Sequence, residues 1–91
     1  MRKFIIEREI PKVGTLEREQ LREVAKTSNA ALAKLGTDIQ WVQSYVVDDK
    51  IYCVYNATAP AIIDEHARCL GVPATHISQV RAVIDPTTGE E

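Results

Sequence analysis

Two strand-like runs separated by a short polar turn constrain the fold more than any other feature of this chain. Residues 39–47, "IQWVQSYVV", and residues 51–57, "IYCVYNA", are rich in β-branched and aromatic side chains, which suit a pleated, half-buried surface. Only the polar stretch "DDK" stands between them. A connection this short joins neighbouring antiparallel strands. We therefore expect a β-hairpin in the middle of the chain, with the other elements arranged around it.

The segment before the hairpin predicts an amphipathic helix over residues 16–36, "LEREQLREVAKTSNAALAKLG". Thr15 is expected to cap its first turn, and Gly36 stands where a glycine ends a helix. Small and apolar side chains recur at steps of three and four residues, which places them on one face. This stripe consists of Leu21, Val24, Ala25, Ser28, Leu32 and Leu35.

The segment after the hairpin predicts a second helix with equally clear ends. Thr58 or Ala59 is the expected cap, and Pro60 suits the first helical position because its missing N–H has no helical partner there. Gly71 and Pro73 end the helix. Its apolar side consists of Ile62, Ile63, His66, Ala67 and Leu70.

Strands are predicted at both ends, over residues 2–8, "RKFIIER", and residues 76–84, "HISQVRAVI". The order β-α-β-β-α-β is that of the α+β ferredoxin-like fold, a four-stranded antiparallel sheet with two helices on one face. A chain of 91 residues has room for one core. We expect one domain over residues 1–85 and a frayed polar tail over residues 86–91.

Composition excludes several classes of protein. Eleven basic and thirteen acidic residues give a net charge of −2, and the basic ones form no run, so nucleic acid is not an expected partner. No apolar stretch has the length of a membrane span, and the start "MRKFIIEREIP" is unlike a signal peptide. We expect a cytoplasmic protein in which Cys53 and Cys69 are free thiols.

Apolar residues on both faces of the sheet predict association. Phe4 and Ile6 share one face of the first strand. Alternation on the next strand places Ile39, Trp41, Tyr45 and Val47 on one face, and Val42 and Val46 on the other, under the helices. Two helices cover only one face of a sheet, so we expect a homodimer in which two sheets meet. Alternatively, Trp41 and Tyr45 belong to the core under the helices, because a period of two does not reveal which face is buried.

The stretch "DEHARCLGVPATH", residues 64–76, concentrates possible metal ligands. These are Asp64, Glu65, His66, Cys69 and His76. His66 and Cys69 are three residues apart on the predicted helix and share a face, and imidazole with thiolate suits Zn²⁺, Ni²⁺ or Cu²⁺. Two ligands are fewer than a stable site needs. The alternative is structural, with His66 half-buried, Cys69 a small buried hydrophobe and His76 a surface residue at a strand start.

Two further strand residues are candidates for chemistry. Cys53 lies mid-strand, where a cysteine is usually buried and unreactive. Glu7 lies beside apolar residues in the first strand. If Glu7, Tyr52 and His66 face one pocket, they form a set of base, donor and acid.

The run "WVQSYVVDDKIYCVYNATAPAIIDEHARCLGVPATHISQV" resembles a family of small bacterial proteins described as nickel-responsive or nickel-binding. The similar blocks are an aromatic-Ser-Tyr-Val strand, a return strand with a central cysteine, and "EHAR" followed by "GVPA". They extend, with "FIIER" at the start, over nearly the whole chain. The resemblance implies a ferredoxin-like fold and dimers of the α+β barrel type.

The resemblance also implies ligand residues. Cys53 and His66 match the family pattern, which makes them metal or ligand candidates together with Glu7. Nickel-binding members carry further histidines in the first strand and the first helix. Here the first strand has Glu7 and Arg8, and the helix has Val24, Ala25 and Lys26. Glu7 is able to replace a histidine as an oxygen ligand.

Three functions follow as expectations. The first is a cytosolic homodimer that binds a small ligand or a transition metal such as Ni²⁺. The second is a cofactor-free enzyme, similar to small monooxygenases or lactone isomerases, acting on a small apolar substrate; no catalytic residue is assigned. The third is a partner-binding module without a ligand. The residues expected to line a pocket are Trp41, Tyr45, Tyr52 and Cys69, beside His66.

Overall fold

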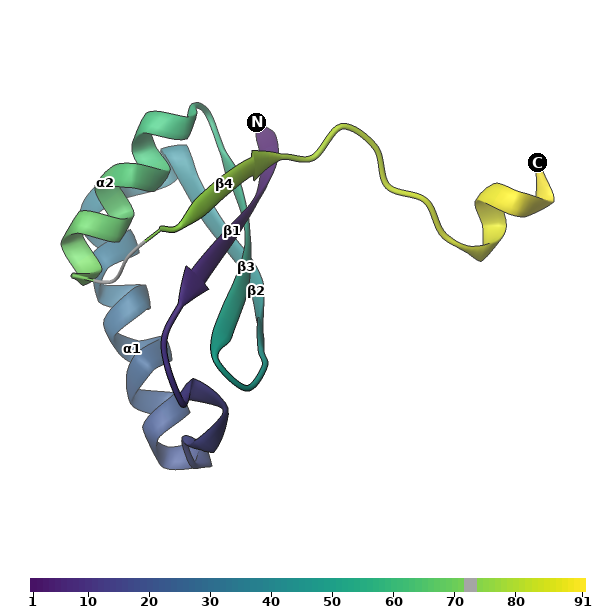
Figure 1. The fold of residues 1–91 in the computed structure, drawn as a ribbon. Helices are drawn as coiled ribbons and strands as arrows, with labels where there is room; N and C mark the ends of the chain where they lie inside the picture. Colours follow the sequence, from purple (N-terminus) through teal and green to yellow (C-terminus); the bar gives the residue numbers. More distant parts are fainter. Residues whose placement is uncertain (72–73) are drawn as a thin grey trace.

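A computed structural model describes residues 1–71 and 74–91 of the chain. The elements are β1 (Arg2–Glu9), α1 (Arg18–Leu35), β2 (Ile39–Val46), β3 (Lys50–Ala57), α2 (Pro60–Leu70) and β4 (His76–Gln79), with short 3₁₀ helices η1 (Val13–Thr15), η2 (Gly36–Asp38) and η3 (Pro86–Glu90). The strands form one antiparallel sheet in the order β2-β3-β1-β4. Both helices lie on the same face of this sheet (Figure 1). The α+β ferredoxin-like prediction is confirmed.

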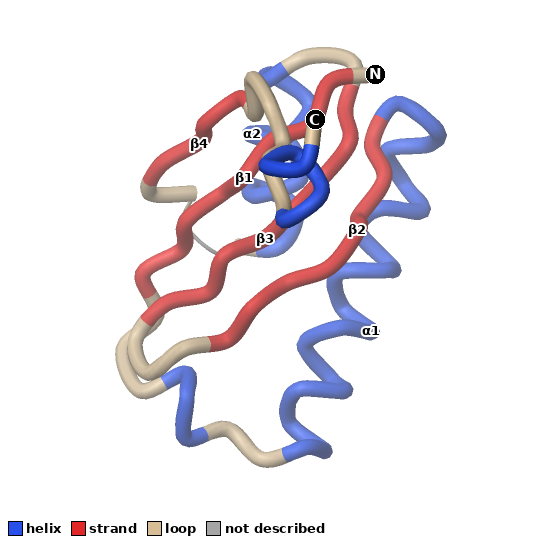
Figure 2. The backbone as a smooth tube through the Cα atoms, turned by 90° about the vertical axis from the view of Figure 1, so that its right-hand side faces the viewer, coloured by secondary structure: helices blue, strands red, loops and turns tan. Residues whose placement is uncertain are grey.

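The core fills the space between the sheet and the helices. Phe4 and Ile6 on β1 are almost completely buried, and every second residue of β3 faces the same way. Ile63 of α2 closes the core from the helix side. The buried members of this cluster are Phe4, Ile6, Val13, Ile39, Ile51, Cys53, Tyr55, Ala57 and Ile63. We call the opposite, uncovered side of the sheet its outer face, and Figure 2 shows that side.

A β-bulge in β2 divides the side chains that simple alternation placed together. Trp41 pairs with Tyr55, but the next pair joins Gln43 to Val54, so one residue of β2 is extra. The extra residue reverses the alternation. Trp41 therefore packs against the core, whereas Tyr45 pairs with Tyr52 on the outer face. The predicted common face of Ile39, Trp41, Tyr45 and Val47 is wrong for this reason.

The predicted packing of the remaining valines of β2 needs a similar correction. Val46 pairs with Ile51 and lies on the helix side, but it is 40% exposed. Val42 is 48% exposed instead of covered by the helices. The helices therefore leave part of β2 open to solvent.

The helix ends follow local hydrogen bonding. The N-cap of α1 is Glu17, whose backbone N–H donates to Oε1 of Gln20 at 2.8 Å. The predicted cap Thr15 lies earlier, in η1, where its hydroxyl donates to the Lys12 carbonyl. Helix α2 begins at Pro60 after Ala59, as predicted. Among the described residues, neither helix has the length and apolarity of a membrane span.

Strand β4 is shorter than predicted because its partner ends. The predicted strand ran to residue 84, but the last contact joins the Val80 N–H to the Lys3 carbonyl at 2.8 Å. The same register places Arg2 opposite Arg81 and Met1 opposite Ala82, so no residue of the chain precedes them to pair with residues 83 and 84. Residues 81–91, here called the C-terminal arm, leave the sheet (Figure 1). The tail predicted to fray forms η3, in which Asp85 accepts from the N–H groups of Thr87 and Thr88.

Candidate functional site

An apolar cleft lies between α1 and the sheet. Its volume is about 470 Å³. Leu21, Val24 and Ala25 line it from α1, and Trp41 and Cys53 line it from the sheet. A cleft of this size, with an apolar lining and a few polar groups, is typical of small-molecule sites.

The polar groups of the cleft gather where Arg8, Ser28 and Tyr55 meet. All three line the cleft and are at least 95% buried, with exposed fractions of 2%, 5% and 1%. Directly beside them, the Tyr55 hydroxyl lies 3.0 Å from Nε2 of His66, and the Ser28 hydroxyl lies 3.5 Å from the same atom. The Tyr55 and His66 rings meet edge to face, with centroids 5.2 Å apart. We call these four residues the polar cluster.

His66 is held in its neutral form. Burial, and then the positive charge of Arg8, lower the pKa of the imidazole to about 4. Nδ1 has no hydrogen-bond partner among residues 1–71 and 74–91. A buried N–H without an acceptor costs more than an unused lone pair. The favoured tautomer therefore carries its proton on Nε2 and donates it to the Tyr55 oxygen.

Tyr55 remains a protonated phenol. Burial and the neighbouring Cys53 raise the pKa of its hydroxyl, and the charge of Arg8, with hydrogen bonds from Arg8 and Ser28, offsets this only in part. Because the phenol keeps its proton, it is able to donate a hydrogen bond. The cleft therefore ends in a cation and two hydroxyl groups.

The structure separates the three residues that were predicted as metal or ligand candidates. Cys53 lines the cleft and His66 lies behind Tyr55, both on the helix side of the sheet. Glu7 lies on the outer face, opposite Tyr52 of β3, and its Oε1 is 3.6 Å from Nζ of Lys50. Within one chain, Glu7 and Tyr52 therefore do not share a pocket with His66.

The residues predicted to line a pocket are also divided. Trp41 lines the cleft, whereas Tyr45 is 54% exposed on the outer face. Cys69 is exposed, although His66 on the same helix is completely buried. A helical turn takes about 3.6 residues, so a residue three positions along the helix does not point in quite the same direction. With His66 at the centre of the buried face of α2, Cys69 lies at the edge of that face. His76 is exposed at the first position of β4, as predicted.

Sequence reasoning missed Arg8, Ser28 and Tyr55 as site residues. Arg8 and Ser28 each interrupt an apolar pattern that was itself recognised. Arg8 continues the buried alternation of Phe4 and Ile6 on β1, and Ser28 lies in the apolar stripe of α1. A polar residue in phase with buried neighbours is the signal that points to such a site.

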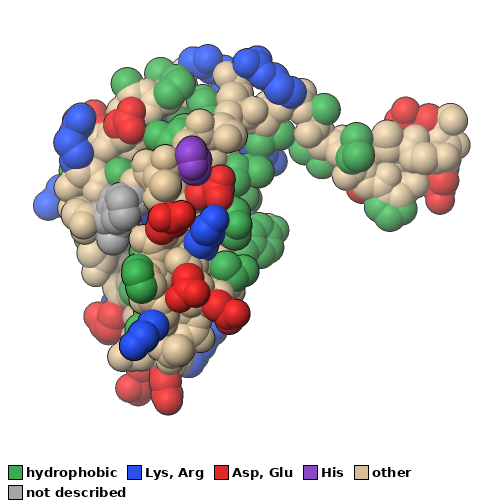
Figure 3. Space-filling view, in the orientation of Figure 1, with side chains coloured by type: hydrophobic (Ala, Val, Ile, Leu, Met, Phe, Trp, Pro, Cys, Tyr) green, Lys and Arg blue, Asp and Glu red, His purple; other side chains and the backbone are tan. Residues whose placement is uncertain are grey.

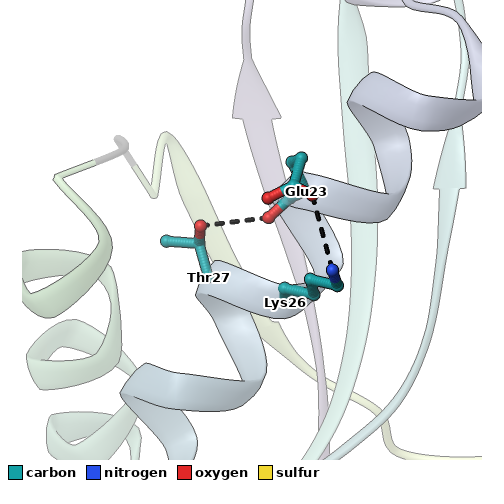
Figure 4. A network of polar contacts seen from close by, with 3 residues as sticks. All are labelled: Glu23, Lys26 and Thr27. Atoms are coloured by element: carbon teal, nitrogen blue, oxygen red, sulfur yellow. Dashed lines mark hydrogen bonds and ion pairs between the residues drawn. The ribbon is translucent and has the colours of Figure 1, made fainter.

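The rim of the cleft on α1 carries charge that is largely compensated. Glu23 lines the cleft, and its Oε1 lies 3.5 Å from Nζ of Lys26 (Figure 4). The Thr27 hydroxyl donates to the Glu23 carbonyl at 3.0 Å. Arg18 lies on the same rim. The charged lining is thus cationic at the buried end, and at the mouth the charge of Glu23 is offset by Lys26 and Arg18.

The side chains do not form a site suited to a transition metal. Among the described residues, no three His, Cys, Asp or Glu side chains are grouped as a metal ion requires. Residues 72 and 73 are Val and Pro, which carry no ligating side chain. Nε2 of His66 already contacts Tyr55. Within one copy, the described residues therefore do not fit a nickel site with three donors.

Comparison with known proteins gives two findings. A family model described as "Nickel responsive protein SCO4226-like" matches residues 4–80. The crystal structure of SCO4226 from Streptomyces coelicolor A3(2) matches with a TM-score of 0.75 and 14% identity, covering 90% of this chain and 99% of that one. No curated protein sequence matches the chain. At this identity, the structural match shows the fold, and the family model shows the family.

Proposed function

Because the chain belongs to the nickel-responsive SCO4226-like family, with a donor set that does not suit the metal, we propose that it is a ligand-binding protein whose cleft takes an organic anion. The observation that carries the proposal is the buried guanidinium of Arg8 at the end of an apolar cleft. The ligand has an apolar body and one anionic oxygen group, such as a carboxylate.

The polar cluster supports the choice of an anion. A buried cation favours a ligand of opposite charge, and a guanidinium matches the two oxygens of a carboxylate. Tyr55, which stays protonated, supplies a hydroxyl donor beside it, and the Ser28 hydroxyl hydrogen-bonds to Tyr55. Glu23, the acid on the rim, is paired with Lys26 and opposes an incoming anion less than a lone carboxylate does.

We expect purified protein to bind octanoate at least about tenfold more tightly than 1-octanol or octylamine. These probes share one apolar chain, and a tenfold preference corresponds to about 1.4 kcal/mol, within the range of a hydrogen bond to a charged group. Isothermal titration calorimetry measures the three affinities. In Arg8→Met, the preference for octanoate over 1-octanol disappears.

Two further variants separate loss of the charge from loss of the fold. Arg8→Lys keeps the charge and retains part of the preference. Arg22→Met removes an exposed arginine of α1 that does not line the cleft and leaves all three affinities unchanged. Equal binding of the three probes by the unmodified protein would refute the anion site.

Nickel enters as a separate expectation. The family is described as nickel-responsive, and the proposed site uses no metal. We expect Ni²⁺ titrated into the metal-free chain to bind no more tightly than about millimolar, or roughly 4 kcal/mol. A micromolar one-to-one site that His66→Gln abolishes would assign nickel to His66 and contradict the proposal.

We also propose that the protein is a homodimer joined through its outer faces. Ile5 is 38% exposed and Tyr45 is 54% exposed on that face. Between them lie Tyr52 and Val54, which pair with both neighbouring strands. We call Ile5, Tyr45, Tyr52 and Val54 the outer apolar patch. A continuous apolar patch on a sheet is typical of an interaction surface.

Two further parts of the proposal concern the location of the protein in the cell and whether its cleft catalyses a reaction. Cys53 and Cys69 are free thiols, which suits the reducing cytoplasm that we propose as the location. The alternative of a cofactor-free enzyme was expected to use Trp41, Tyr45, Tyr52 and His66 around one pocket. Tyr45 and Tyr52 lie on the outer face instead, so we assign no reaction to the cleft.

A further inference from the structure

The C-terminal arm lies beyond the part of the chain that the family model matches. It begins after residue 80, where the family model ends. Val83 and Ile84 stand in its middle with exposed fractions of 72% and 80%. η3 follows them and carries no buried residue. Two adjacent, largely exposed aliphatic side chains on the arm are available to pack against another surface.

The arm leaves the molecule on the side of the outer face. In Figure 1 the helices lie on the left of the sheet and the arm runs out to the right. Figure 2, viewed from that side, shows η3 in front of the strands. Hydrophobic side chains line the right-hand edge of the body in Figure 3 and recur in the arm. The arm and the outer apolar patch therefore point toward the same partner.

We propose that the arm binds a second copy of this chain, with Val83 and Ile84 packed against the partner at the margin of its outer face, beside the contact between the two sheets. The proposal rests on the homodimer proposed above. When two outer faces meet about a two-fold axis, each arm projects past the interface toward the other copy, and the two contacts are equivalent. The five residues 81–85 span up to about 17 Å, roughly three strand spacings.

The direction of the arm distinguishes this arrangement from a fold-back onto its own sheet. An arm covering its own outer face would bury Val83 and Ile84 in the monomer, but both are exposed. It would also shield the outer apolar patch from a partner. Removing a fold-back arm would then strengthen association, whereas removing an exchanged arm weakens it.

The test compares dimer dissociation constants by analytical ultracentrifugation over a dilution series. The variants are the full chain, the chain ended after Val80, Val83→Ser/Ile84→Ser and, as the matched control, Glu90→Ser/Glu91→Ser. We expect truncation and the double serine variant at the aliphatic pair to raise the dissociation constant at least about tenfold, because each removes two buried aliphatic groups. The dissociation constant of the control stays within about twofold of that of the full chain, since the control alters only exposed charges at the end of the arm.

A second measurement uses the arm as a peptide. We expect a peptide of residues 81–91, "RAVIDPTTGEE", to bind the truncated chain. The same peptide with serine in place of Val83 and Ile84 is expected not to bind. A full-length dimer that truncation leaves equally tight or makes tighter overturns arm exchange and leaves the homodimer standing. If the full-length chain is still a monomer at about 100 μM, both arm exchange and the homodimer are overturned.

Discussion

Acidification from pH 6.5 to pH 4 is expected to remove about 3 kcal/mol of folding stability through His66 alone. Burial and the charge of Arg8 lower the pKa of the folded imidazole to about 4, whereas an unfolded histidine titrates near 6.5. Between these values the unfolded chain binds a proton that the folded chain does not. Stability is unaffected by this group above pH 6.5, falls as the pH drops below it, and stops falling below the folded pKa.

Urea denaturation at several pH values between 7 and 4, at constant protein concentration, measures this effect. His66→Gln removes the titrating ring and keeps a group able to hydrogen-bond to Tyr55. The variant is expected to be less stable at pH 7 and to depend less on pH, so its difference from the unmodified chain shrinks as the pH falls. His76→Gln is the matched control because His76 is exposed. Retention of the full pH dependence by His66→Gln would show that other groups cause it.

The same burial explains why the role of His66 was only half predictable. Its place on the apolar side of α2 follows from helical spacing, and the sequence correctly indicated that side. Its partners come from two other elements, Tyr55 from β3 and Ser28 from α1, which lies 38 residues earlier in the chain. Periodicity shows that a residue faces inward, but only the three-dimensional arrangement shows what it meets there.

The fold was predictable wherever a local signal decides it. Pro60 and Gly71 mark the two ends of α2, and the short turn after residue 47 requires a hairpin. The bulge at residues 41–43 was not predictable, because no glycine or proline marks it. One extra residue in β2 moved Tyr45 to the outer face and left Trp41 in the core. The end of β4 was missed because it depends on where β1 begins.

Replacement of Phe4 by alanine is expected to cost about 3–5 kcal/mol of folding stability. Phe4 is 1% exposed at the centre of the core, so the truncated side chain leaves a cavity and loses its burial. Ile5→Ala, one residue along the same strand, is expected to cost less than about 1 kcal/mol in the monomer, because Ile5 is 38% exposed on the outer face. The contrast measures which face of β1 is buried by the helices.

Urea denaturation of the three chains below the concentration at which they associate gives the two differences. Phe4→Leu keeps most of the volume and is expected to lie between the unmodified chain and Phe4→Ala, which provides a folded reference if the alanine variant unfolds. The dimer dissociation constant provides a second comparison of positions 4 and 5. Because Ile5 belongs to the outer apolar patch, Ile5→Ala weakens dimerisation, whereas Phe4→Leu does not. Comparable unfolding costs for Phe4→Ala and Ile5→Ala would contradict both the face assignment of β1 and the use of its other face as an interface.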